Sequence, residues 1–170
     1  MDLLIIRHAI AEAAGGPDTA GDALRPLSAR GRAKMRRAAR GLERLVPELD
    51  VLATSPLLRA RQTADIVAED LEGFPSPVVL GALAPEGSWE DLLAWLGGQE
   101  PGARVAWVGH EPSLSTAASR LLCGLDRSFL RFKKGGAALI AFDGPPAPGA
   151  GRLLWLVTPG QLRRLTGGAA

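Results

Sequence analysis

The sequence predicts one α/β domain of three layers, with a mostly parallel central sheet and helices on both faces. Short apolar segments alternate along the chain with longer segments whose apolar residues recur every three or four positions. Residues 2–7 are apolar toward both faces, as in a central parallel strand. Because helices of about ten residues separate most of the strands, we expect right-handed crossovers. The 170 residues suit a single domain, expected over 1–165, with a frayed tail at 166–170.

The expected elements follow one another in alternating order. Strands are expected at residues 2–7, 50–55, 76–83 and 104–110, with a closing pair at 137–142 and 152–157. Helices are expected from Ser28 to about residue 46, and at 56–71, 88–96, 112–122 and 159–165.

Three dipeptides mark the expected starts of helices: Ser55-Pro56, Glu111-Pro112 and Thr158-Pro159. Each follows a strand, and an acceptor side chain before proline is typical of an N-cap and first helical residue. The first two helices would begin at the carboxyl ends of strands, the edge where parallel sheets bind ligands. Free backbone N–H groups at such helix ends favour an anion.

Composition excludes several classes of protein. A net charge of +2 is too small to indicate nucleic-acid binding, and the absence of tyrosine leaves few side chains to stack on bases. Cys123 is the single cysteine, so no internal disulfide forms, and its apolar neighbours predict a packed thiol in a reducing compartment. No apolar segment approaches the ~20 residues of a membrane span. We therefore expect a cytoplasmic protein that binds neither nucleic acid nor membrane.

Both histidines of the chain are expected at the carboxyl edge of the sheet. Arg7 and His8 end the first strand, Arg59 lies one turn into the second helix, and His110 ends the fourth strand. Guanidinium groups match the oxygens of a phosphoryl group, and neutral imidazole is a nucleophile for phosphorus. Taken singly, each histidine could instead be a core or capping residue, and Arg59 a surface arginine.

These residues resemble a known family. "RHA" after the first strand, "SPLLRARQTA" after the second and "VGHEP" after a later one are similar to the histidine phosphatase superfamily, the phosphoglycerate-mutase-like group. The short chain, "RPLSARG", "LAPEG" and "TPGQL" most resemble bacterial SixA-type phosphohistidine phosphatases. The resemblance implies a phosphoglycerate-mutase-like fold. It further implies that His8 is the phosphorylated nucleophile, that Arg7 and Arg59 bind phosphoryl oxygens, and that His110 donates to the transition state.

The leading hypothesis is a phosphatase that releases phosphate from a phosphohistidine protein of a phosphorelay or phosphocarrier system, through phospho-His8. No metal or other cofactor is expected, because no carboxylates or histidines have metal-ligand spacing. The alternative is a phosphatase or mutase for a small phosphate ester, with Glu86 as proton donor. The position of Glu86 before a helix favours a turn residue instead. A third hypothesis is a non-catalytic module that binds phosphorylated partners.

Two basic features stay open at this point. Arg25 could guide substrate into the pocket or pair with a local acid such as Asp22. A series of cations covers the polar side of the first helix, either as a solvated face or as a docking surface for an acidic partner. Its members are Arg30, Arg32, Lys34, Arg36, Arg37, Arg40 and Arg44.

Overall fold

The central strand of the sheet is the first apolar segment of the chain. In a computed structural model that describes residues 1–13, 21–70 and 73–166, β1 (Asp2–Arg7) has Leu3 to Ile6 fully buried. It pairs in parallel with β4 (Arg104–Gly109) and antiparallel with β5 (Ala137–Ala141). Because β1 lies between two strands and between two layers of helices, its side chains on both faces are buried and apolar.

The remaining strands extend the sheet on both sides of β1. β2 (Val51–Thr54) and β3 (Val78–Val79) continue the parallel side, and β6 (Arg152–Val157) pairs antiparallel with β5. The order of the six strands is β3-β2-β4-β1-β5-β6. The predicted mostly parallel sheet is confirmed, with β5 as the antiparallel member.

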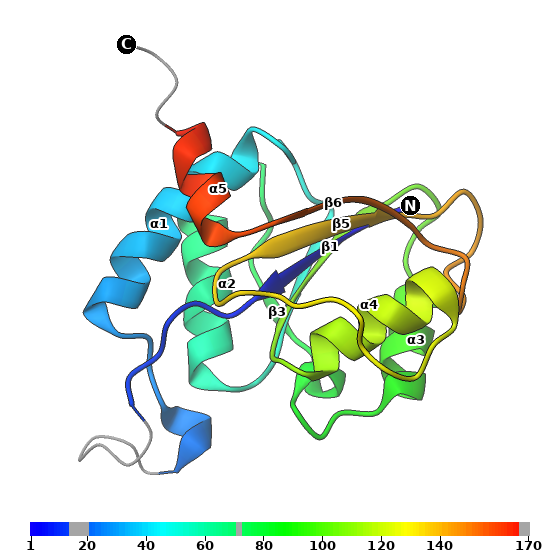
Figure 1. Ribbon diagram of the computed structural model, residues 1–170, viewed down its shortest axis with the longest axis horizontal. Coiled ribbons are helices and arrows are strands. Elements are labelled where there is room, and N and C mark those ends of the chain that lie inside the picture. Colours follow the sequence, from blue (N-terminus) through cyan, green and yellow to red (C-terminus); the bar gives the residue numbers. More distant parts are fainter. Residues whose placement is uncertain (14–20, 71–72, 167–170) are drawn as a thin grey trace.

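Helices cover both faces of the sheet (Figure 1). α1 (Ala29–Glu43), α2 (Leu58–Asp70) and α5 (Pro159–Leu165) pack on the face that includes Leu4 and Ile6. α3 (Trp89–Gly97) and α4 (Ser113–Cys123) pack on the face that includes Leu3 and Ile5. Two 3-10 turns, η1 (Asp22–Leu24) and η2 (Gly81–Leu83), precede α1 and α3. The three-layer prediction is therefore confirmed.

One of the three predicted N-cap dipeptides behaves as expected. Thr158 caps α5 in a capping box with Gln161, and Pro159 begins the helix. The prediction is wrong at the other two. α2 begins at Leu58 rather than Pro56, and Pro112 occupies the N-cap position of α4 in place of Glu111. Ser55 and Glu111 instead bond to groups of the candidate site described below.

Two further expectations need correction. The third strand is confined to Val78 and Val79, both exposed, because it forms the edge of the sheet and residues 81–83 turn into η2. The Cys123 thiol is exposed rather than packed, since the residue ends α4. In the described part of the chain, no helix is both long and apolar enough to cross a membrane. The expected tail beyond Thr166 lies outside the described residues.

Candidate active site

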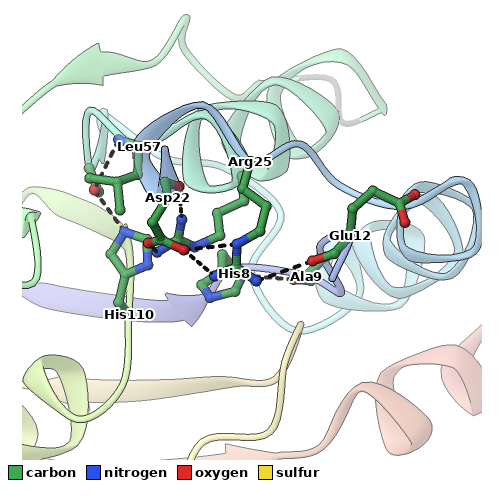
Figure 2. A network of polar contacts seen from close by, with 9 residues as sticks. His8, Ala9, Glu12, Asp22, Arg25, Leu57 and His110 are labelled. Carbon is green, nitrogen blue, oxygen red and sulfur yellow. Dashed lines mark hydrogen bonds and ion pairs between the residues drawn. The ribbon is translucent and has the colours of Figure 1, made fainter. Parts of the chain in front are cut away.

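Parallel pairing of β1 with β4 brings the two histidines side by side. Arg7 lies opposite Gly109 in the register, and the His8 backbone N–H donates to the Gly109 carbonyl at 3.0 Å. His8 and His110 therefore leave the sheet together, with their ring centroids 5.0 Å apart (Figure 2). Both side chains are buried, at 6 % and 3 % exposure.

The protonation of His8 follows from its hydrogen bond to the backbone. Its Nδ1 lies 2.7 Å from the Ala9 carbonyl oxygen. A carbonyl only accepts, so Nδ1 carries the proton and Nε2 keeps a free lone pair. Burial lowers the pKa of His8 to about 3; the Ala9 carbonyl opposes this shift, and the charges of His110 and Arg59 add to it. At neutral pH the imidazole is uncharged and has a nucleophilic nitrogen.

A buried threonine fixes the backbone that carries this carbonyl. The Ala9 N–H donates to Thr63 Oγ1 at 3.0 Å, and the Thr63 hydroxyl donates to the Arg59 carbonyl at 2.7 Å. Thr63 is fully buried on α2. The chain after His8 is thereby bonded to the helix that carries Arg59.

His110 is held by Ser55, the residue that follows β2. Its Nε2 lies 2.8 Å from Ser55 Oγ, and the same oxygen accepts the Leu57 N–H at 3.3 Å. The Ser55 hydroxyl can donate its proton to Nε2, and in that tautomer the imidazole proton of His110 lies on Nδ1. Nδ1 is buried and has no hydrogen-bond partner among the described residues. Burial, followed by the charge of Arg59, lowers the pKa of His110 to about 4, so this ring is also neutral.

Arg7 is anchored by one nitrogen of its guanidinium. Nη1 donates to the Phe132 carbonyl at 2.7 Å, and the Phe132 N–H donates to Glu111 Oε1 at 2.7 Å. Glu111 also accepts from Ser115 Oγ, which explains why its carboxylate does not cap α4. Burial lowers the pKa of Arg7 and the Glu111 charge opposes that shift. The buried Nε of Arg7 has no partner in the described structure.

Arg59 is 4 % exposed and faces a carboxylate of its own chain. Nη1 donates to the Asp22 carbonyl at 2.8 Å, and Nη2 donates to Asp22 Oδ2 at 2.9 Å. Arg25 holds the other oxygen, with Nη2 2.7 Å from Asp22 Oδ1 (Figure 2). Partial burial opposes ionisation of Asp22, but the Arg25 hydrogen bond and the two guanidinium charges lower its pKa. Nη2 of Arg59 thus already binds an anionic group, while the buried Nε has no partner in the described structure.

The sequence-predicted site residues do not all lie together. Arg7 and Arg59 both act on the pKa of His8 and of His110, and Arg25 also acts on that of His110. Arg25 pairs with Asp22, one of its two predicted roles, while remaining close to the site. Glu86 lies on an exposed turn after η2, where Ser113 Oγ donates to the neighbouring Pro85 carbonyl at 3.3 Å. Nothing in the described structure bonds the Glu86 carboxylate to the histidines.

Sequence reasoning missed three polar residues of this site. The sequence indicates Asp22 only as a local partner of Arg25. It places Ser55 at the carboxyl edge of the sheet as a helix cap, without a bond to His110, and assigns no role to Thr63. The one signal available was the spacing of Asp22 and Arg25, three residues apart. No group of three or more His, Cys, Asp or Glu within residues 1–13, 21–70 and 73–166 could hold a metal ion.

The six-stranded sheet, with two neutral histidines and two arginines at its carboxyl edge, defines a protein of the phosphoglycerate-mutase-like class. The family model described as "Histidine phosphatase superfamily (branch 1)" matches residues 3–92. The chain belongs to this superfamily.

Individual relatives agree with this assignment. Phosphohistidine phosphatase SixA of Escherichia coli is 29 % identical over 165 residues, which cover 96 % of this chain and 97 % of the relative. An uncharacterised protein of Picosynechococcus is 41 % identical over 138 residues, covering 80 % and 82 %.

Solved structures give the same result. The structure of SixA complexed with tungstate matches with a TM-score of 0.80 and 29 % identity, over 95 % of this chain and 99 % of that one. A phosphoserine phosphatase of Entamoeba histolytica has a TM-score of 0.67 over 95 % and 98 %, and at 16 % identity this likeness concerns the fold alone. Family and SixA-like structure together support a phosphatase.

Proposed function

We propose that this protein is a metal-independent phosphohistidine phosphatase that forms a covalent intermediate on Nε2 of His8. The observation that carries the proposal is the bond from His8 Nδ1 to the Ala9 carbonyl, which leaves Nε2 unprotonated and next to His110. Guanidinium groups supply the positive charge that a metal ion provides in other phosphoryl-transfer sites.

In the first step the Nε2 lone pair of His8 forms a bond to phosphorus. The bond from phosphorus to the substrate imidazole breaks, and its electron pair returns to the substrate nitrogen. Because the other nitrogen of that ring carries a proton, the leaving group is neutral imidazole. Arg7, Arg59 and the Nδ1 proton of His110 neutralise the equatorial oxygens. To bind these oxygens, Arg59 exchanges the Asp22 carboxylate for the phosphoryl group. In the second step water forms the new bond to phosphorus and loses a proton, and the electron pair returns to His8.

The leaving group and the comparison both support this choice of substrate class. An imidazole leaves readily, so its departure needs no strong protein acid, whereas an alkoxide does. Glu86 is exposed and has no bond to the histidines, which fits an imidazole leaving group. The 29 % identity to a phosphohistidine phosphatase over nearly the whole chain supports the same choice. The substrate would be a phosphorelay or phosphocarrier protein, and a cytoplasmic location stays a prediction.

A panel of substrates tests the proposal. Phosphate release is measured from a phosphohistidine peptide, a phosphoserine peptide and sugar phosphates, each with the wild-type protein and with His8→Ala. We expect release from the phosphohistidine peptide alone, and its loss in His8→Ala. Faster turnover of sugar phosphates would favour the small-ester alternative, and binding without any turnover would favour the non-catalytic module.

A further inference from the structure

A small basic cavity lies beside the nucleophile and takes no part in the proposed chemistry. It has a volume of about 100 Å³ and is formed by the chain after His8, by α1, by the segment before β5 and by α5. Three cations from three of these elements line it: Lys34, Lys134 and Arg163. Figure 1 shows α1 and α5 side by side at this end of the molecule.

The charge of this cavity is not neutralised. No acidic residue lines it, and within the described part of the chain none of its three cations forms an ion pair. The charges of Arg30 and, more weakly, Arg163 lower the pKa of Lys34, as expected for cations gathered without a counter-charge. The site is therefore suited to an anion.

The cavity shares a wall with the active site. Ala9 and Ile10, the two residues after His8, line it. Gly135 also lines it and donates its N–H to the carbonyls of Arg7 and His8, at 3.0 and 3.1 Å. A protein that presents a phosphohistidine to His8 would cover this cavity with the surface that flanks the modified residue.

The size of the cavity decides between kinds of occupant. Pockets for cofactors and metabolites measure roughly 300–1,000 Å³. A volume of about 100 Å³ lies well below that range and has room for one carboxylate side chain. Part of its lining is apolar and can contact the methylene groups of such a side chain: Ala9, Met35, Ala38 and Pro159.

We propose that Lys34, Lys134 and Arg163 form a docking site for an acidic side chain next to the phosphohistidine of the protein substrate. This inference rests on the proposed function, because it concerns the substrate that function requires. On this proposal, the acidic partner docks at the cavity, and not along the whole series of cations on α1.

Two phosphohistidine peptides of equal length test the docking site, one with Asp and Glu around the modified residue and one with Ser and Ala. We expect kcat/KM to be about tenfold higher for the acidic peptide, as for a few partly exposed ion pairs together. The preference should fall toward unity in 0.5 M NaCl, where charges are screened. It should also fall toward unity in Lys34→Glu.

Arg40→Glu is the matched control, because Arg40 lies exposed on the same helix and does not line the cavity. It should keep the preference for the acidic peptide. Equal hydrolysis of both peptides by the wild type would overturn the docking site and leave the proposed function intact. Equal loss in Lys34→Glu and Arg40→Glu would also overturn it, by assigning the preference to the general charge of α1. Failure to hydrolyse either peptide would instead overturn the proposed function.

Discussion

Asp22→Asn should tighten the binding of tetrahedral oxyanions. The Asp22 carboxylate takes the Nη2 donor of Arg59, which the proposed mechanism assigns to the phosphoryl group. Replacing it with a neutral amide of the same shape removes the competing charge. Bonds to a charged partner contribute about 1.5–3 kcal/mol. The Asp22 side chain is 58 % exposed, and solvent screens the pair. We therefore expect an effect smaller than the lower limit of this range. A gain of about 1 kcal/mol corresponds to roughly fivefold tighter binding.

The assay is calorimetric titration with tungstate and competitive inhibition by inorganic phosphate, at constant ionic strength. Asp126→Asn is the matched control, because Asp126 pairs with Arg120 and its side chain is 74 % exposed. The control should leave both affinities unchanged. Weaker or unchanged binding of tungstate to Asp22→Asn would refute the reasoning. Weaker binding would also show that Asp22 orients Arg59 for the anion rather than competing with it.

Three further outcomes follow from the structure. The pKa values of His8 and His110, lowered to about 3 and about 4 from 6.5, mean that the unfolded chain takes up protons first as the pH falls. Stability in urea titrations should be full above pH ~6.5 and lower by about 2 kcal/mol per histidine at pH 5, and an unchanged value would contradict these shifts. Gly31→Ala puts a Cβ 1.9 Å from the Ile10 carbonyl oxygen. This variant should lose about 1–3 kcal/mol of stability and therefore melt at a lower temperature. Its kcat should also fall. Gly97→Ala meets nothing within 4 Å and should do neither. Glu86→Gln should keep its rate of phosphate release from a phosphohistidine peptide within about twofold, whereas a loss of tenfold or more would identify Glu86 as the proton donor.

The position of Arg7, His8 and His110 at one edge of the sheet could be predicted, because it depends only on how parallel strands are arranged. Parallel strands place their carboxyl ends at one edge, so residues that end buried strands gather there whatever the loops do. Arg59 could be anticipated from its unfavourable place near a helix N-terminus. The catalytic roles of these residues stay predictions.

The contacts of Asp22 could not be predicted in the same way. Its bond to Arg59 joins η1 to α2, across 37 residues of sequence, and depends on how the chain before α1 folds back. Only the short-range pair with Arg25 has a sequence pattern. The capping predictions show the same limit. Thr158 has no tertiary competitor and caps α5, whereas Ser55 binds His110 and Glu111 binds the Phe132 N–H.

Capture of the phosphorylated enzyme tests the central claim most directly. The protein is mixed with a phosphohistidine peptide, quenched at alkaline pH and digested, and the phosphorylated residue is located by mass spectrometry. We expect one phosphoryl group on His8, formed before phosphate appears in solution and absent from His8→Ala. Phosphate release at full rate with no phosphoryl group on His8, or with the group on another residue, would contradict the account.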